Sequence, residues 1–495
     1  MKGWTDHGET ARAEGSGETD GKLTFDSSSP EANEAFTWAR SQALAYAFSH
    51  DPVGPWYEAA LPGREAFCMR DVSHQAMGAH ALGLAANTKN MLRRFAENVS
   101  ESRDWCSLWE IDRYGSPPLA DYLNDDEFWF CLPANFDVLD CCRRMYGWTG
   151  DRDYLLDPAF LEFYRRTVYE YVERWDLGID KIMKRQRILN ARADLASGSR
   201  LTRPRGIPGY NEESWDFTAG FDLLAAMYAG YRAYAGIQDI LGNRREASTF
   251  RDRASAVRRL IHEVWWDEKA RAYFDFTDAS GTPIHGDRRS SFAALYWRTT
   301  DDREKLRAIV ERTKRDAPDG PSDGVEGQSH LAEVLYRYGE KEAAYRQLLY
   351  VSKSRRREYP EVSYSVIGAM VTGLMGIELD FAPPSGALKA GDYVDRTLST
   401  TPRIPDAGGW AHLEHLRVRG NIVTVRHEGM TRTTVTNFYG PSLIWKARFP
   451  GSRGAITADG GSQRTVAEEH PVTGEAVAAA EVIVGAGESI TAEVR

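Results

Sequence analysis

The chain has 495 residues, of which 42% are hydrophobic and 27% are charged, and this composition is typical of a folded globular protein. Its net charge of −10 disfavours a nucleic-acid backbone as a partner, and no run of 18 apolar residues indicates a membrane span. The length favours one large domain accompanied by a smaller one.

The five cysteines have no C-x-x-C spacing, so we expect reduced, packed thiols and neither a disulfide framework nor a zinc site. We expect no cofactor, because G-x-G-x-x-G and Walker A motifs are missing, and no other metal, because EF-hand and H-E-x-x-H patterns are missing. The missing G-x-S-x-G motif disfavours serine-esterase chemistry. Residues 1–22 lack the apolar core of a signal peptide, which favours a cytoplasmic protein unless such a peptide was removed.

Residues 1–29 are polar and Gly-rich and predict a loose arm with a short strand at 23–25. A long helical region follows, in which apolar residues recur every three or four positions. The helices are predicted at 31–49, 71–86, 87–98, 126–147, 157–174, 217–240, 245–266, 289–298, 302–315, 328–339, 341–352 and 362–376.

After Pro383-Pro384 the pattern changes to β-branched alternation, as at 421–425, 433–436 and 481–484. We therefore divide the chain into an arm (1–29), a helical catalytic domain (30–385) and an antiparallel β module (386–495). About a dozen helices with long and short loops in alternation favour a mainly α fold, the (α/α)6 barrel, over an irregular helical core. No fixed-length repeat indicates a solenoid.

The first polar cluster lies at the loop–helix junction 64–75 and contains Arg64, Arg70, Asp71, His74 and Gln75. If Asp71 begins the helix, these side chains form a face that could bind sugar hydroxyls. Either arginine could also hold a uronic-acid carboxylate in a bidentate clamp. The alternative is a network of caps and ion pairs that serves structure alone.

Two further loops place aromatic residues beside acids. One contains Trp109, Glu110 and Arg113, and the other contributes Asn135 and Asp137 after a proline. Each taken alone fits surface or capping chemistry, but several such loops in one helical domain indicate a common substrate pocket.

The segment 211–217, Asn-Glu-Glu-Ser-Trp-Asp-Phe, is the most informative in the chain. Glu212, Glu213 and Asp216 crowd around Trp215, whose ring offers a flat apolar surface to a sugar. A carboxyl group partly desolvated against an indole can stay protonated near neutral pH and act as a general acid. The alternative is an acidic helix start that interacts with the helix dipole.

The segment 213–217, Glu-Ser-Trp-Asp-Phe, resembles the E-S-G-W-D-F signature of trehalases with one glycine missing. The segment 364–377, followed by the β module, resembles the last barrel helix of rhamnosidase-like enzymes. The chain thus resembles the six-hairpin glycosidase clan, which includes trehalases, processing α-glucosidases, glucoamylases and α-L-rhamnosidases, over residues 30–480. The trehalase motif Q-W-D-x-P-x-G-W and the large N-terminal β-sandwich common in these families are absent, so no family is assigned.

The resemblance implies an exo-acting, inverting glycoside hydrolase whose substrate is an oligosaccharide or glycoside. It places the general acid within 212–216, where the match selects Asp216 and next Glu213. It places the general base before the twelfth helix, where the carboxylates are Glu361 and Glu358. Glu326, in a Gly-flanked acidic turn, is a further candidate, and the choice among these bases stays open.

Two other functions fit the same residues. One is a uronate-directed enzyme on the same helical fold, either an unsaturated glucuronyl hydrolase or a polysaccharide lyase. The other is a carbohydrate-binding protein without catalysis. The sugar, its linkage and the oligomeric state are left open by the sequence.

Overall fold

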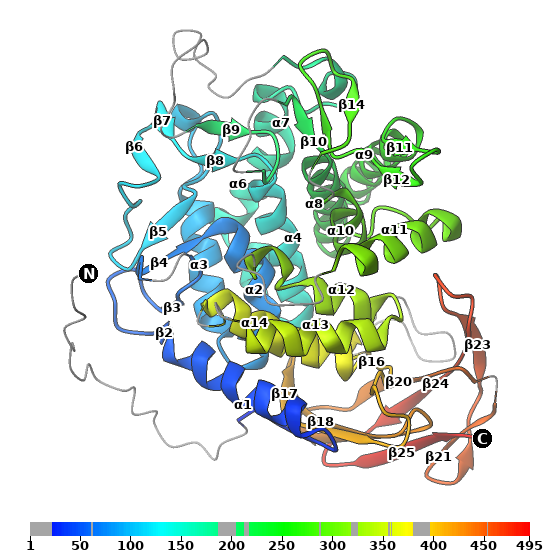
Figure 1. The fold of residues 1–495 in the computed structure, drawn as a ribbon. Coiled ribbons are helices and arrows are strands. Elements are labelled where there is room, and N and C mark those ends of the chain that lie inside the picture. Colours follow the sequence, from blue (N-terminus) through cyan, green and yellow to red (C-terminus); the bar gives the residue numbers. More distant parts are fainter. Residues whose placement is uncertain are drawn as a thin grey trace.

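The computed structural model describes residues 22–60, 63–186, 204–211, 217–286, 289–317, 325–354, 357, 359–379, 397–452 and 454–495. A mainly helical part comes first, and β-sheets follow at the C-terminal end, as Figure 1 shows. This confirms the expected combination of a helical region with a C-terminal β module.

Six helices contact one another in a closed series, in which the last helix returns to the first. We call them the inner helices. They are α2 (Met69–Ala81), α4 (Ala134–Thr149), α8 (Phe221–Ile240), α10 (Ser290–Tyr296), α12 (Leu331–Arg337) and α14 (Pro360–Gly368), the last prolonged by the π-helical turn η5 (Ala369–Leu374). Every residue of α14 is buried, as expected for a helix surrounded by others.

The remaining long helices pack outside this series, each against one or more inner helices or their neighbours. They are α1 (Pro30–Ala45), α3 (Ala85–Glu97), α6 (Pro158–Arg166) with η2 (Thr167–Tyr171) and α7 (Val172–Arg174), α9 (Arg244–Glu263), α11 (Arg303–Asp316) and α13 (Lys341–Lys353). The short α5 (Asp153–Leu156) precedes α6. They are amphipathic: α3, for example, buries Thr88, Met91, Leu92 and Phe95 on one face.

Short strands lie in the loops before the inner helices. β4 (Ala66–Cys68) runs directly into α2 and pairs with β5 (Glu110–Asp112). The other strands of these loops are β2 (Ala47–Phe48), β3 (Trp56–Tyr57), β6 (Tyr122–Asn124), β7 (Glu127–Phe128), β8 (Phe130–Cys131), β9 (Arg205–Ile207), β10 (Ala219–Gly220), β11 (Trp266–Asp267), β12 (Ala272–Tyr273), β13 (Phe276–Thr277) and β14 (Pro283–Ile284).

The predicted helix at 126–147 is wrong over its first turns. Residues 127–131 form the strands β7 and β8, and the helix begins at Ala134 after Pro133. The proline lacks an N–H and is therefore tolerated at a helix start but not inside one. Pro133 thus marks the beginning of α4 and does not interrupt a longer helix.

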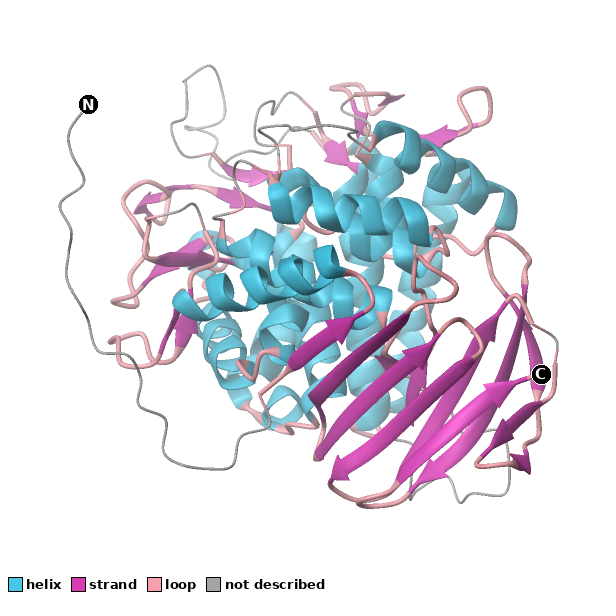
Figure 2. Cartoon of the chain, turned by 60° about the horizontal axis from the view of Figure 1, so that its bottom comes forward, coloured by secondary structure: helices cyan, strands magenta, loops and turns pink. Residues whose placement is uncertain are grey.

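The C-terminal module contains two sheets (Figure 2), with strand orders β1-β17-β18-β19-β25-β21-β22 and β15-β16-β20-β24-β23. Among the described strand pairs of these two sheets, only β16 and β20 run parallel. Their strands are β1 (Thr24–Ser27), β15 (Glu378–Leu379), β16 (Thr397–Thr400), β17 (Trp410–Val418), β18 (Asn421–Glu428), β19 (Arg432–Tyr439), β20 (Leu443–Pro450), β21 (Ile456–Ala458), β22 (Gly461–Ser462), β23 (Val466–Glu469), β24 (Ala476–Val484) and β25 (Ser489–Val494).

Contacts at several points join the module to the helices, and three of them involve β1 and two buried histidines. The N-terminal strand β1 pairs with β17 and leads straight into α1. Nε2 of buried His80 in α2 donates a hydrogen bond to the Arg417 carbonyl at 2.9 Å. Nε2 of buried His427 in β18 donates to the Met375 carbonyl at 3.0 Å. Burial lowers the pKa of both imidazoles to about 4, so both are neutral at pH 7. In the described ranges, no helix is both long and apolar enough to cross a membrane.

Candidate functional site

The N-terminal ends of the inner helices bring together the polar residues of several distant loops. Helix α2 supplies Arg70, Asp71 and His74, α4 supplies Asp137, and the first turn of α14 supplies Glu361. The strand β4 positions α2, because the helix begins at the residue that follows Cys68. Asp71, Asp137 and Glu361 are all buried.

Asp137 is a common acceptor for three elements. Its carboxylate accepts hydrogen bonds from the hydroxyl of Tyr210 and from Nε1 of Trp297, the latter at 2.9 Å. Nε2 of His74 lies 3.3 Å from the same carboxylate. A buried carboxylate requires such partners, so Asp137 fixes the relative positions of α2, α4, the end of α10 and segment 204–211.

His74 is enclosed by aromatic rings. Its ring centroid lies 4.9 Å from that of Tyr296 and 5.3 Å from that of His330. Burial lowers the pKa of His74 and outweighs the opposite effect of Asp137. The imidazole is therefore neutral at pH 7, which suits hydrogen bonding better than charge compensation.

Glu361 is held by the segment that precedes α12. The hydroxyl of Ser329 donates to its Oε1 at 3.1 Å, and Nε2 of His330 lies 3.7 Å from the same oxygen. Burial acts to raise the pKa of Glu361, but interaction with His330 and the positive charge of Arg70 lower it overall. Glu361 is thus kept ionised although it is buried.

Asp71 has the opposite character. Its Oδ1 lies 3.1 Å from Nε of Arg70, yet burial and then the negative charge of Glu361 raise its pKa to about 7. One carboxyl of this pair therefore holds a proton more readily than usual, while the other gives it up more readily. Pairs of carboxyl groups whose pKa values are pushed apart are typical of acid–base sites.

Two aromatic rings, tilted by 53° to each other, and a guanidinium group lie beside Asp71. The guanidinium carbon of Arg70 is 5.8 Å from the ring centroid of Trp109 and 5.4 Å from that of Tyr210. The two rings are 6.4 Å apart. Aromatic rings beside a carboxyl group and a guanidinium are a common combination in sugar-binding sites.

A second charged cluster lies on β5 and its neighbours. NH1 of Arg64 lies 2.6 Å from Glu110 and 3.0 Å from Asp121. Burial, and then the neighbouring Asp121, raise the pKa of Glu110 to about 9 in spite of Arg64. Arg64 therefore already interacts with two acidic residues. The sequence had suggested that Arg64 or Arg70 could hold the carboxylate of a uronic acid, and at Arg64 such a ligand would have to displace these partners.

Three predicted residues have other surroundings. Arg113 pairs with Asp51 and Glu65, each at 2.6 Å, and does not contact Asp137 or Glu361. Asn135 donates to the Trp105 carbonyl at 3.1 Å and so supports a loop. Gln75 is fully buried, and its amide atoms have no hydrogen-bond partner within the described part of the chain.

The predicted acids Glu212, Glu213 and Asp216, with Trp215, lie outside the described residues, as does Glu358. The segment before them is fixed, because Tyr210 donates its hydroxyl to Asp137 and its backbone N–H to Asp222. The backbone of Glu326 begins the short turn η4 (Glu326–Gln328), which leads toward His330.

Sequence reasoning missed Tyr210, Ser329, His330 and Trp297. Two signals pointed to them: Tyr210 ends a Gly-Ile-Pro-Gly-Tyr loop next to the acidic segment, and Ser329-His330 follows the acidic turn at 323–328. No local pattern singles out Trp297, which ends a short helix and joins the site only through the fold.

The family model of the mannosylglycerate hydrolase MGH1-like glycoside hydrolase domain matches residues 165–321, about a third of the chain. A search among curated proteins gives no match. Solved structures give many matches, and all those compared below are under 25% identical to this chain, so they show the fold alone.

The α-L-rhamnosidase of Dictyoglumus thermophilum has a TM-score of 0.62 and 14% identity over 96% of this chain and 51% of its own. The α-L-rhamnosidase of Aspergillus terreus has a TM-score of 0.55 and 13% identity over 94% and 50%. A putative kojibiose phosphorylase from the human microbiome has a TM-score of 0.52 and 9% identity over 94% and 67%.

The chain spans about half the length of the two rhamnosidases. The domain match identifies a glycoside hydrolase domain in residues 165–321, and the structural likenesses show the same fold over most of the chain. Both findings agree with the six-hairpin glycosidase clan, and neither assigns a family.

Proposed function

We propose that this chain removes a terminal sugar from an oligosaccharide or glycoside, with inversion at the anomeric carbon. We infer that the inner helices are the inner ring of an (α/α)6 barrel, because they contact one another in a closed series. Their N-terminal ends would then surround the reacting bond. We also propose 30–385 as the catalytic domain and 386–495 as the β module.

The observation that carries the proposal is the state of Glu361. It is buried at the N-terminal end of α14, yet its pKa is lowered, so it is ready to accept a proton. A general base that activates water must be ionised at the working pH. We therefore assign Glu361, rather than Glu326 or Glu358, as the base, with His330 and Ser329 as positioning residues.

We assign the general acid to the segment 212–216, with Asp216 first and Glu213 second. Tyr210, which precedes this segment in the sequence, is held against Asp137 at the same end of the inner helices as Glu361, and this supports the assignment. In an inverting enzyme the two carboxyl groups stand roughly 6.5–9.5 Å apart, which leaves room for the attacking water.

The remaining polar residues would bind the sugar. Asp71 and Arg70 offer hydrogen bonds to hydroxyl groups, and the rings of Trp109 and Tyr210 offer flat apolar surfaces. Because burial and the charge of Glu361 raise its pKa to about 7, Asp71 can carry a proton near neutral pH and donate as well as accept.

The test is hydrolysis of a panel of aryl glycosides by the full chain and by Glu361→Gln. We expect the substitution to lower kcat by about a hundredfold or more, because proton abstraction from water is lost. The matched control is Glu342→Gln, since Glu342 also lies in the first turn of a helix but is exposed. Full activity of the Glu361→Gln variant would show that Glu361 is not the general base.

The acid is tested separately with two leaving groups. Asp216→Asn should lose about a hundredfold or more on a glycoside with a poor leaving group. It should lose much less on an activated aryl glycoside, whose departure needs little protonation. Equal losses on both substrates, with the fold intact, would move the acid role to Glu213 or Glu212.

The uronate-directed alternative gains no support from Arg64, because a uronate would have to compete there with Glu110 and Asp121. Absorbance at the unsaturated-uronate band during turnover distinguishes the three reactions. It rises for a lyase, falls for an unsaturated glucuronyl hydrolase and stays constant for ordinary hydrolysis. Sugar binding without turnover of any substrate would support the non-catalytic alternative.

A further inference from the structure

A cavity of about 440 Å³ lies at the C-terminal ends of the inner helices, at the opposite end from Glu361. Its wall includes Arg232 of α8, Arg298 just after α10 and Arg337 of α12. His74 and Trp297 line it as well, and both also contact Asp137, so they separate it from the candidate catalytic centre. We call it the far cavity.

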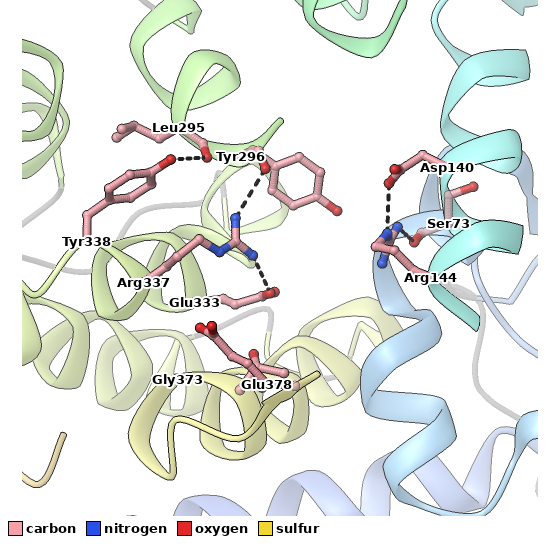
Figure 3. A network of polar contacts seen from close by, with 12 residues as sticks. Ser73, Asp140, Arg144, Leu295, Tyr296, Glu333, Arg337, Tyr338, Gly373 and Glu378 are labelled. Atoms are coloured by element: carbon pink, nitrogen blue, oxygen red, sulfur yellow. Dashed lines mark hydrogen bonds and ion pairs between the residues drawn. The ribbon is translucent and has the colours of Figure 1, made fainter. Parts of the chain in front are cut away.

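More arginines than carboxylates line the far cavity. The arginines are Arg143, Arg144, Arg232, Arg298 and Arg337, and the carboxylates are Asp140, Glu333 and Glu378. Each carboxylate already has an arginine partner. Figure 3 shows two of these pairs, Asp140–Arg144 and Glu333–Arg337, each at 2.8 Å. The third pair is Glu378–Arg403 at 3.4 Å.

Arg143 has further contacts of its own, so Arg232 and Arg298 are the arginines left over. Both side chains are exposed to the water of the cavity, and neither forms an ion pair or a side-chain hydrogen bond with a described residue. The charge of Arg337, and then the enclosure of the side chain by the cavity wall, lower the pKa of Arg298, as expected for a guanidinium with cationic neighbours. The nearby carboxylate of Glu378 pairs with Arg403 instead.

The backbone of Arg298 is strained. Its φ of 56° lies in the left-handed region, which is favourable for glycine and costly for other residues. The residue follows the end of α10, where a glycine is the usual choice. Strain that is maintained at a single residue is common at binding sites, because the side chain is needed in that position.

The C-terminal end of α10 does not itself require the positive charge of Arg298. The C-terminal end of a helix carries a partial negative charge that a cation could neutralise. In α10, however, the Leu295 carbonyl accepts from the Tyr338 hydroxyl at 3.0 Å, and the Tyr296 carbonyl accepts from Arg337 at 3.1 Å (Figure 3). These bonds satisfy the terminal carbonyls without Arg298.

We propose that the far cavity is a second ligand site, which takes a monosaccharide that carries a phosphate or carboxylate group. Guanidinium groups bind both oxyanions with paired hydrogen bonds. The volume lies in the usual range for small-molecule sites and exceeds what an inorganic anion needs. The rings of Trp148, Tyr296 and Trp297 line the same cavity and offer surfaces for a sugar ring.

The test is isothermal titration of the full chain carrying Glu361→Gln, so that turnover is absent, with glucose 6-phosphate and with glucuronate. Glucose and inorganic phosphate serve as reference ligands at matched ionic strength. We expect one of the two charged sugars to bind at least about tenfold more tightly than either reference. Binding of glucose 6-phosphate would identify a phosphate site, and binding of glucuronate would identify a carboxylate site.

Arg298→Gly and Arg232→Gln should each weaken that binding by about tenfold or more, because a charge-assisted bond is lost. The matched control is Arg271→Gly, which removes an exposed arginine at a φ of 49° in the turn between β11 and β12 and should keep full affinity. Both glycine variants should raise Tm without ligand. The proposal is overturned if neither charged sugar binds, or if Arg298→Gly binds as tightly as the parent.

Discussion

Asp71 and Glu361 are the same functional group in two different surroundings. Glu361 faces Ser329, His330 and the positive charge of Arg70, and these interactions favour its ionised form. Asp71 is paired with Arg70 as well, but burial and the charge of Glu361 dominate, and its pKa rises to about 7. The neighbours, and not the residue type, determine which carboxyl carries the proton.

Replacement of Asp71 by asparagine should stabilise the fold at high pH. The folded pKa is about 7 and the ordinary value 3.8, so the folded state binds this proton more tightly. The cost of the ionised form is absent below about pH 3.8, grows as the pH rises and is complete above about pH 7. Asp71→Asn should therefore gain up to about 4 kcal/mol at pH 8 and less than half of that at pH 5.

Denaturant unfolding at the two pH values measures this difference. Asp252→Asn, on the exposed face of α9, is the control and should change nothing at either pH. A loss of stability in Asp71→Asn that is the same at pH 5 and pH 8 would show that the carboxylate stabilises the fold. Activity should fall in either case, because a sugar contact is removed.

At the residue scale, sequence reasoning identified single residues but not their partners. Asp71 was named as an acid at the expected start of a helix, and Glu361 because the clan resemblance places the general base before the twelfth helix. Their electrostatic coupling, and the role of Asp137 as a common acceptor, depend on contacts between residues separated by tens to hundreds of positions. No local spacing encodes such contacts.

At the scale of the elements, the helices followed from the sequence and the loop strands did not. Each of the twelve predicted helices has a counterpart, because three- and four-residue periodicity is a local property. The segment 126–133 was misassigned because β8 pairs with β9, more than seventy residues away, and only this pairing makes it a strand. Two-residue strands carry too little pattern to be seen in advance.

The bond from Trp297 to Asp137 ties the end of α10 to α4. Trp297→Phe should cost about 1–3 kcal/mol of unfolding free energy, because a buried carboxylate loses a donor. The control is Trp265→Phe: Trp265 is also buried, but its Nε1 has no hydrogen-bond partner among the described residues. Chemical denaturation compares the two, and equal losses would indicate that packing alone, without the hydrogen bond, explains the effect.

At the scale of the whole molecule, the two ends of the inner helices carry different chemistry. Acidic groups and aromatic rings gather at the N-terminal ends, and unpaired arginines at the C-terminal ends. Residues of α2 and α10 lie between the two, since His74 and Trp297 contact Asp137 and also line the far cavity.

The β module and the helices should unfold together, because β1 belongs to the sheet of the module and leads into α1. Phe25 of β1 is buried and lies 5.5 Å from Phe36 of α1, measured between ring centroids. Phe25→Ala should cost about 3 kcal/mol and lower the Tm of a single transition. Phe438→Ala is the control, since this ring is 60% exposed. Two separate transitions would contradict the coupling.

The central claim is that Glu361 activates a water molecule for direct attack on the anomeric carbon. Proton NMR of the first sugar released from a cleaved glycoside tests it most directly, because the anomer is seen before mutarotation. Direct attack predicts a product of inverted configuration, and Glu361→Gln should lose this product while keeping the fold. A first product of retained configuration would contradict the account, since it requires a covalent intermediate and a carboxylate nucleophile.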